Sequence, residues 1–240
     1  MKALRWFVLA VGFAIGGLLI GYPYLNEAVY THTANTVIQS FREQVEAEQE
    51  TAVIGTDLPG VIYPELLQAM LDYNQSLIDN GQASLSSPAA YEQSPVDLGD
   101  YGLESDSAIG TVAIPAIDLE LPLYMGASKD QMAKGAAVMG GTSLPVGGES
   151  TNSVIAGHRG YKGIPYFRNL DKLKPGDTVL ITNYWETMTY AVTGTKIIKP
   201  NDIDTILIEH GKDKITLLTC HPYTVGTERL LIYCERMNNP

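Results

Sequence analysis

The sequence has 240 residues, of which 45% are hydrophobic, enough for one domain of ordinary size with appendages. Its formal net charge is −11 and no Lys/Arg-rich run follows the N-terminus, which argues against nucleic acid as a partner. Two cysteines are too few for a disulfide framework or for a metal site built from paired cysteines.

The N-terminus predicts a membrane anchor. Lys2 and Arg5 precede an apolar span from Trp6 to Leu25, and Glu27 is the first acid. About 20 residues suffice to cross a bilayer as a helix, and the basic residues before the span orient the N-terminus inward. The alternative is a cleaved signal peptide, but no small-x-small cleavage site follows the apolar run. We expect residues 1–25 to be an uncleaved single-pass signal anchor, with the remainder outside the cell.

Residues 26–106 are predicted to form a helical stalk followed by a linker. Apolar residues recur at helical spacing between Thr33 and Thr51, and after a break at Gly55–Gly60 a second helical pattern runs from Pro64 to Asn80. We interpret the pair as a stalk that holds the next domain off the membrane. The following stretch, 82–106, is rich in Ser, Pro and Ala and has no sustained period, which is typical of a linker or a lid.

From Ile109 to the end the pattern is mainly β, and residues 107–240 are predicted to be one domain. The expected strands are 110–115, 119–124, 153–156, 178–182, 184–192 and 196–199, with a short helix over 129–137. Many short strands with few helices favour a closed or nearly closed barrel.

A hairpin closes the pattern. The apolar run 215–218 leads into Thr219-Cys220, and a second run covers 230–233. We expect Cys220 to end one strand and Arg229 to begin its neighbour, so that the two side chains lie side by side. A thiol beside a guanidinium is biased toward the nucleophilic thiolate. The alternative is a half-buried strand cysteine with a solvent-facing arginine.

The second cysteine, Cys234, has the parity of Leu230 and Ile232, on the face opposite Arg229. It lies about five residues beyond the position opposite Cys220, on the order of 16 Å away, which is too far for a disulfide. We predict two free thiols and a packed core position for Cys234.

A nucleophilic thiol needs a group that protonates the leaving amine. His158 ends its strand between glycines, where a ring can project freely, although an ordinary surface histidine fits the same pattern. His221 would point away from Cys220 and is the less favoured base, and His32 and His210 receive no role. A zinc site built from these cysteines and histidines lacks the usual ligand pairing at short spacing.

These motifs together resemble the sortase signature. The resemblance covers about Ile109 to Arg236 and is carried by several motifs in the right order. They are Gly110–Pro115, Leu121–Tyr124, Ser143–Gly148, Ala156–Arg159, Asn169–Asp177, Thr219-Cys220 and Arg229. The resemblance implies a closed eight-stranded β-barrel.

The helical segment and long loop before the barrel resemble class C sortases, the pilin polymerases. Those enzymes carry a lid whose Asp-Pro-aromatic tripeptide covers the active site, whereas the nearest stretch here is Ser87-Pro88-Ala89, with Tyr91 following. A lid built from it would lack the salt bridge to Arg229, so we expect Ser84–Leu98 to be mobile and the thiol accessible. A second departure is that the sequence ends at Pro240, where many class C members continue into a C-terminal membrane span.

The resemblance implies a transpeptidase that needs no cofactor or metal. Cys220 would attack the Thr–Gly carbonyl of an LPxTG-type sorting signal, His158 would exchange protons with the amines, Arg229 would hold the carbonyl or oxyanion, and Thr219 would line the groove. The implied partners are LPxTG-type surface or pilin proteins, an acceptor amine and the membrane. Alternatives are a housekeeping sortase that anchors proteins to peptidoglycan, a thiol protease, and an inert envelope adaptor.

Overall fold

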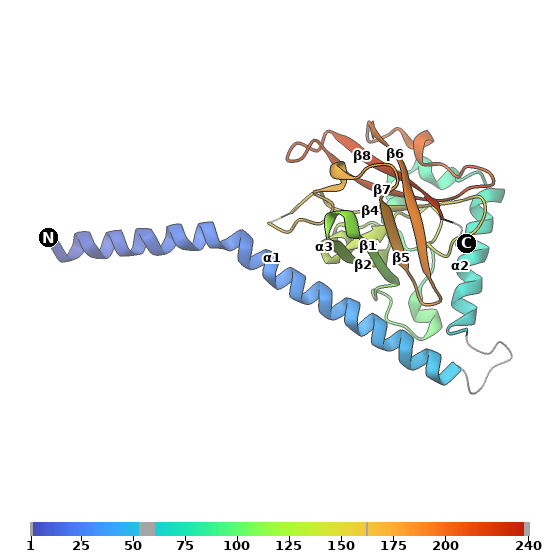
Figure 1. The fold of residues 1–240 in the computed structure, drawn as a ribbon, viewed down its shortest axis with the longest axis horizontal. Coiled ribbons are helices and arrows are strands. Elements are labelled where there is room, and N and C mark those ends of the chain that lie inside the picture. The colour runs from blue at the N-terminus through green and yellow to red at the C-terminus, as the bar shows by residue number, and fades with distance from the viewer. Residues whose placement is uncertain (1, 53–60, 162, 238–240) are drawn as a thin grey trace.

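The computed structural model describes residues 2–52, 61–161 and 163–237, and shows a long helix that projects from a compact β domain (Figure 1). The helices are α1 (Lys2–Ala52), α2 (Pro64–Asp79) and α3 (Lys129–Lys134). The strands are β1 (Gly110–Ile114), β2 (Leu119–Met125), β3 (Ala136–Val138), β4 (Thr151–Ala156), β5 (Thr178–Thr182), β6 (Thr187–Ile198), β7 (Asp213–His221) and β8 (Glu228–Arg236). The predicted break at Gly55–Gly60 lies outside the described residues.

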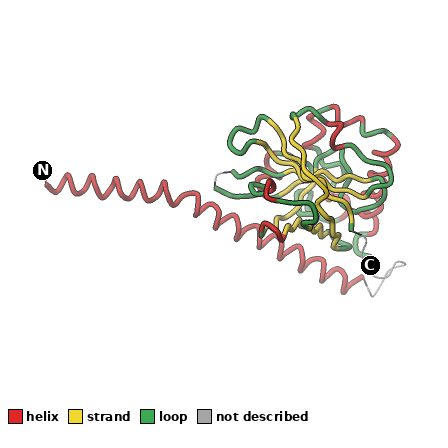
Figure 2. The backbone as a smooth tube through the Cα atoms, turned by 45° about the horizontal axis from the view of Figure 1, so that its top comes forward, coloured by secondary structure: helices red, strands yellow, loops and turns green. Residues whose placement is uncertain are grey.

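The eight strands close into a barrel in the order β1-β2-β3-β4-β7-β8-β6-β5, which confirms the predicted fold class (Figure 2). Two of the neighbouring pairs, β2 with β3 and β4 with β7, are parallel, and the others are antiparallel. The parallel pair of β4 and β7 matters for function, because it brings the end of one strand beside the end of the other.

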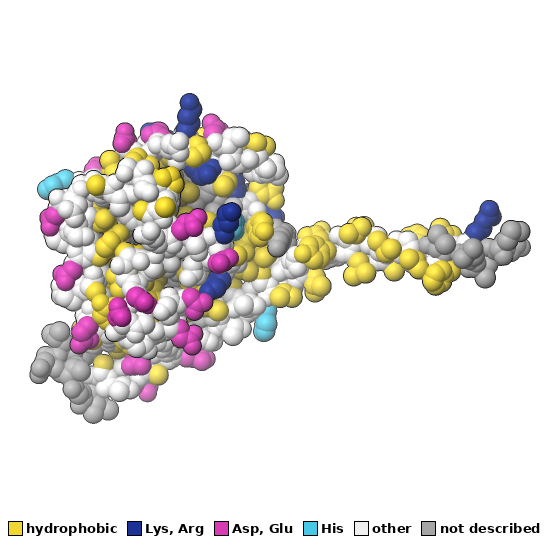
Figure 3. All heavy atoms as spheres, turned by 180° about the vertical axis from the view of Figure 1, so that it is seen from behind, with side chains coloured by type: hydrophobic (Ala, Val, Ile, Leu, Met, Phe, Trp, Pro, Cys, Tyr) yellow, Lys and Arg dark blue, Asp and Glu magenta, His cyan; other side chains and the backbone are white. Residues whose placement is uncertain are grey.

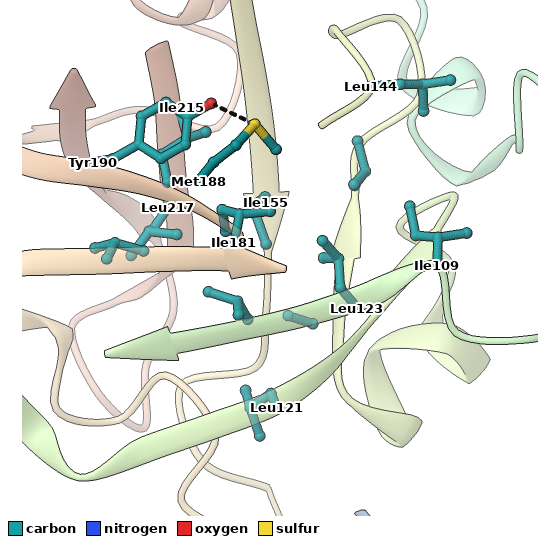
Figure 4. Packing of buried hydrophobic residues seen from close by; sticks show 14 of the residues in the cluster. Ile109, Leu121, Leu123, Leu144, Ile155, Ile181, Met188, Tyr190, Ile215 and Leu217 are labelled. Atoms are coloured by element: carbon teal, nitrogen blue, oxygen red, sulfur yellow. Dashed lines mark hydrogen bonds between the residues drawn. The ribbon is translucent and has the colours of Figure 1, made fainter. Parts of the chain in front are cut away.

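Alternation along the strands gives the barrel an apolar interior. The inward residues include Ile155 on β4, Leu217 on β7 and Ile232 on β8, all fully buried in one cluster (Figure 4). At one end of this interior the hydroxyl of Tyr190 lies 3.5 Å from the sulfur of Met188. Successive strand residues point to opposite faces, so the residues between these inward positions face outward.

The outward residues of the same strands form a second buried cluster. It includes Ala156 and Leu231, and it is covered by Leu85 and Tyr91 from the segment before the barrel. That segment, predicted as a linker, contains three short 3₁₀ turns at Ala83–Ser86, Pro88–Glu92 and Leu98–Tyr101. One outer wall of the barrel is therefore a second core, and the segment is its cover.

The helix α1 is continuous from the apolar span into the stretch that was predicted as a separate helix. In its second half Phe41 packs against Tyr184 at 5.1 Å between ring centroids, Arg42 pairs with Glu120, and Tyr30 donates to the carbonyl of Lys134. This half lies along the barrel and does not hold it at a distance. The first half projects from the domain, and its large apolar side chains are exposed (Figure 3).

Two elements differ from the expected strand pattern. The short helix expected over 129–137 ends at Lys134, and its last residues form the three-residue strand β3. The two strands expected over 184–199 are one strand, β6, whose register against β8 shifts between Val192 and Gly194. A bulge of this kind bends a strand without ending it, which a turn-like Gly in the sequence does not reveal.

Candidate active site

Three predicted site residues form a row across three neighbouring strands. In the parallel pair β4–β7, Ala156 lies opposite Leu218, an offset of 62 residues. Continued two residues past this last pair, the same offset brings His158, just beyond the end of β4, beside Cys220. The antiparallel pair β7–β8 places Cys220 directly opposite Arg229. Base, thiol and cation therefore follow one another across adjacent backbones spaced about 4.8 Å apart.

All three residues belong to the outer face of the barrel. Each lies two residues along its chain from a residue that belongs to the outer cluster or packs on it, and therefore faces the same side. These neighbours are Ala156 for His158, Leu218 for Cys220 and Leu231 for Arg229. Cys220, His158 and Arg229 are each half-buried at the end where this cluster stops. The site thus lies on the outer wall of the barrel. It adjoins the outer apolar cluster on which the covering segment packs.

Arg229 is fixed by the loop it adjoins. Its Nη1 donates to the carbonyl oxygens of Gly226 at 3.0 Å and of Glu228 at 2.9 Å. Among the described residues its Nε and Nη2 have no hydrogen-bond acceptor. A guanidinium held through one nitrogen keeps the rest of its fork available for an incoming carbonyl oxygen.

The imidazole of His158 lies between two tyrosines. It stacks on Tyr161 at 5.2 Å between ring centroids and meets the edge of Tyr166 at 5.7 Å. Burial lowers the pKa of His158 below its ordinary value of 6.5. The neutral ring is therefore favoured near pH 7, which suits a group that accepts a proton from an amine or a thiol.

Glycine precedes His158 for a steric reason. A Cβ at position 157 would stand 2.7 Å from the ring of Phe167. The carbonyl of Gly157 accepts a 2.8 Å hydrogen bond from the hydroxyl of Thr219, which is buried on the inward face of β7. Thr219 was predicted to line the substrate groove. Its hydroxyl instead donates to the backbone next to His158.

Sequence reasoning assigned no role to Arg159, although the structure places it at the centre of the site. Its side chain is only 6% exposed, and its guanidinium contacts the carbonyl of Cys220, Nδ1 of His221 and, at 2.8 Å, the carboxylate of Asp171. One cation therefore joins the histidine loop to the cysteine strand. The sequence held one indication of this role. Arg159 directly follows His158, so its side chain points to the opposite, inward face of the barrel.

The predicted lid residues lie on the covering segment. Ser87, Pro88 and Ala89 are exposed, and the carbonyl of Tyr91 accepts from the backbone N–H groups of Ala127 and Gly140 at 2.9 and 3.0 Å. Within the described ranges no hydrogen bond or ion pair joins these residues to the row of His158, Cys220 and Arg229, which we call the catalytic row for the role proposed below. The mobility expected for this segment stays a prediction; its contacts to the barrel are apolar anchors in the outer cluster, Leu85 and Tyr91.

The remaining cysteine and histidines lie apart from the row. Cys234 is fully buried, as predicted, and burial raises the pKa of its thiol to about 12. His221 points away from Cys220 toward Arg159, while His32 and His210 are exposed. Across residues 2–52, 61–161 and 163–237, no group of three or more His, Cys, Asp or Glu side chains could hold a metal ion.

The arrangement suits acyl transfer through a thiol. It supplies a half-buried nucleophile, a neutral imidazole on one side and a guanidinium on the other. An amide carbonyl that reaches the sulfur would have its oxygen near the cation and its leaving nitrogen near the imidazole.

Comparison with known proteins decides the family. A family model described as the sortase domain matches residues 112–237, more than half of the sequence. The chain belongs to the sortase family. It is a cysteine transpeptidase with structural similarity to class C sortases.

Relatives of this sortase include proteins named Sortase A and proteins named sortase C. Sortase A of Bacillus anthracis is 25% identical over 222 residues, covering 92% of this chain and 88% of the relative. Sortase C1 of GBS Pilus Island 1 superposes with a TM-score of 0.72 at 29% identity, covering 86% of this chain and 99% of that one. The Clostridium perfringens sortase C with its C-terminal cell wall sorting motif has a TM-score of 0.64 at 33% identity, covering 86% and 100%.

Proposed function

We propose that this sortase polymerises pilins: it cleaves an LPxTG-type sorting signal between Thr and Gly and transfers the acyl group to a pilin lysine. The row of His158, Cys220 and Arg229 carries the chemical part of the proposal. The pilin part is supported by the likeness to sortase C1 of GBS Pilus Island 1 over almost that whole chain.

In the proposed reaction the neutral imidazole of His158 takes the proton of the Cys220 thiol, the resulting thiolate attacks the Thr carbonyl carbon, and the C–O double bond opens toward Arg229. The Thr–Gly bond then breaks, His158 gives its proton to the departing glycine amine, and a thioester remains on the sulfur. An incoming amine attacks the thioester and passes a proton to His158, and the sulfur leaves as thiolate. Arg229 stabilises the oxyanion of both tetrahedral intermediates, since its guanidinium is fixed before substrate arrives.

Two further parts of the proposal concern Thr219 and the covering segment. The buried hydroxyl of Thr219 donates to the carbonyl of Gly157. Its contribution to substrate binding is therefore indirect, because it positions the loop that carries His158. Ser87-Pro88-Ala89 and Tyr91 would border the substrate groove as a lid, because their segment covers the outer face that continues from the site.

The apolar stretch of α1 would hold this enzyme in the membrane, with the barrel outside the cell. Among the described helices, α1 alone is long and apolar enough to cross a bilayer. Tyr22 and Tyr24 are exposed near the end of that stretch, where aromatic side chains favour the membrane–water interface.

A housekeeping role is the second candidate, and the similarity to Sortase A of Bacillus anthracis over 92% of this chain favours it. In that case the acceptor would be the peptide bridge of a cell-wall precursor. The two functions share the thioester and differ only in the amine that resolves it.

The deciding experiment is mass spectrometry of the full chain in detergent with an LPxTG peptide and a candidate pilin domain. We expect a thioester adduct on Cys220 that resolves onto a pilin lysine. Resolution only onto oligoglycine or water would favour wall anchoring or hydrolysis. Cys220→Ala should form no adduct, whereas Cys234→Ala, a matched thiol deletion inside the barrel, should still form one.

A further inference from the structure

The two loops that flank the catalytic row form one surface at one end of the barrel. The loop after β4 carries Tyr161, which is 45% exposed, and the loop between β7 and β8 carries Tyr223 and Val225, which are 44% and 67% exposed. Arg168 links them, because it donates to the carbonyl of Gly163 and lies 5.4 Å from the ring of Tyr223. We call Tyr161, Tyr223 and Val225, with Arg168, the aromatic rim.

The loop after β4, which carries Tyr161 of the aromatic rim, contacts α1 through Gly163 where the apolar span ends. A Cβ at Gly163 would stand 2.7 Å from the carbonyl oxygen of Pro23, so this loop packs directly on the helix backbone and needs a glycine to do so. Pro23 lies in the last turn of the apolar stretch 6–25. The loop therefore sits at the depth at which α1 would leave the bilayer.

Both loops point toward the side from which α1 projects (Figures 1 and 2). α2 and the end of β8 lie on the other side of the domain (Figure 1). The barrel end that carries the site is thus the end nearest to a membrane that holds the projecting helix.

The charge pattern of the rim suits a lipid surface. The sequence has 27 acidic residues, yet neither 156–170 nor 219–227 contains one, and the first of these stretches carries the half-buried Arg168. Tyrosines with an apolar body and a polar tip are the side chains that favour the headgroup region, and arginine attracts lipid phosphates. The two loops of an otherwise acidic protein therefore contain no acid of their own, and the nearest carboxylates in the sequence are Asp171, which pairs with Arg159, and Glu228.

We propose that the aromatic rim rests on the outer surface of the bilayer that holds α1, so that the catalytic row opens at the membrane–water interface. The partner is the lipid headgroup region. This orientation would present the thiol to substrates that are themselves held in the membrane. The inference rests on the proposed anchoring of α1 but does not depend on which amine accepts the acyl group.

Depth-dependent quenching tests the proposal on the full chain. An environment-sensitive fluorophore is attached to Val225→Cys in a Cys220→Ala background, and the protein is placed in nanodiscs whose lipids carry a nitroxide near the headgroup. Leu19→Cys, inside the span, reports anchoring, and Leu71→Cys on α2, which is 40% exposed and apolar, is the matched control. We expect quenching of about twofold or more at positions 19 and 225 and almost none at 71.

The outcomes separate the two proposals. Quenching at 19 but not at 225 would overturn the resting of the rim on the bilayer while leaving the anchor intact. No quenching at 19 would overturn the anchoring itself, and the rim inference with it.

A kinetic test distinguishes a lipid contact from a substrate contact. Val225→Ser should lower the rate on a sorting signal attached to its own membrane span several-fold, and should leave the rate on a soluble sorting peptide unchanged. Equal losses on both substrates would make Val225 a substrate contact and overturn the proposal. Leu71→Ser should change neither rate.

Discussion

Arg159 donates a hydrogen bond to Nδ1 of His221, the residue that follows Cys220, the proposed nucleophile. A guanidinium has no acceptor, so Nδ1 must be the unprotonated nitrogen and His221 carries its proton on Nε2. The contact removes His221 from competition as the base, and it fixes the backbone next to Cys220. The buried guanidinium of Arg159, on the inward side, thus holds the backbone of the residues whose side chains form the row on the outward side.

Replacing Arg159 should damage activity more than folding. We expect Arg159→Met to lower kcat/KM by about tenfold to a hundredfold, because His158 and Cys220 lose their common support. Unfolding in urea should show a loss of about 1–3 kcal/mol from the polar groups left unpaired. Arg42→Met is the matched control, since its pair with Glu120 is exposed and should contribute under about 1 kcal/mol.

Asp171→Asn separates charge from position at the same place. The amide keeps a hydrogen bond to Arg159 but leaves the buried guanidinium without its counter-ion. We expect a smaller loss of kcat/KM than for Arg159→Met, together with a changed nitrogen-15 chemical shift of His221 Nδ1, which accepts the hydrogen bond from Arg159. Wild-type activity in both variants would remove Arg159 from the support of the site.

The two thiols should differ sharply in reactivity. Cys220 is half-buried beside a cation, whereas Cys234 is fully buried and burial raises the pKa of its thiol to about 12. We expect iodoacetamide at pH 8 to add once to the folded protein and to map to Cys220, because the thiolate is the reactive form. A second adduct should appear only in urea. Protection of Cys220 that is relieved by deleting residues 84–98 would show instead that the covering segment closes the site.

The catalytic row illustrates what the sequence could and could not predict. The hairpin period set Cys220 opposite Arg229, and the register confirms this pair. The proximity of His158 was not predictable from its own strand, since a parallel pairing of β4 with β7 joins segments 62 residues apart. The alternation of apolar residues on both sides of a turn predicts which residues face each other in a hairpin. It does not predict which distant strands pair in parallel, because a long crossover separates them in the sequence.

Packing between segments was likewise beyond the sequence pattern. The helical period over 33–51 identified a helix, and the structure shows that its apolar stripe covers the barrel through Ala34, Ile38 and Phe41. The segment 82–106 has no period, yet Leu85 and Leu98 are almost completely buried and anchor it on the barrel. A single anchoring residue carries no periodic signal, so only the fold reveals its partner.

The hydroxyl of Thr219 should matter through Gly157. Thr219→Val keeps the shape of the side chain but leaves the Gly157 carbonyl without its donor, at a cost of about 1–2 kcal/mol in chemical unfolding. We expect kcat to fall while KM for the peptide changes little, because the substitution disturbs the loop that carries His158 and removes no contact with the substrate. Thr193→Val is the control: its hydroxyl donates to Tyr233 at an exposed position, where water can replace it. A rise in KM alone would identify Thr219 as a substrate contact.

His158 should make stability depend on pH in a defined direction. Its folded-state pKa is lowered by burial, so below the unfolded value of about 6.5 the unfolded chain binds a proton that the folded protein does not. Stability from this group is present above pH 6.5 and is lost as pH falls through the folded-state value. We expect wild type to lose more stability between pH 7 and pH 5 than His158→Gln, measured by urea unfolding at each pH. Parallel curves for the two proteins would contradict the lowered pKa.

Tyr30 should connect the anchor helix to the base. Its ring meets the edge of Tyr166 at 4.8 Å, and Tyr166 in turn meets His158. Tyr30→Phe loses only the hydrogen bond to the Lys134 carbonyl and should cost under about 1 kcal/mol in thermal unfolding. Tyr30→Ala removes the ring, and we expect a loss of about 2–3 kcal/mol together with a shifted His158 resonance and a lower kcat.

The matched control for Tyr30 is His32→Ala, an exposed position one half-turn along the same helix, which should leave stability, resonance and rate unchanged. If Tyr30→Ala lowers stability but leaves the His158 resonance and kcat at wild-type values, α1 supports only the barrel. If the resonance and kcat move together, the helix that would hold this sortase in the membrane also sets the position of its base. The ring of Tyr166 is then the physical link, because it contacts both residues.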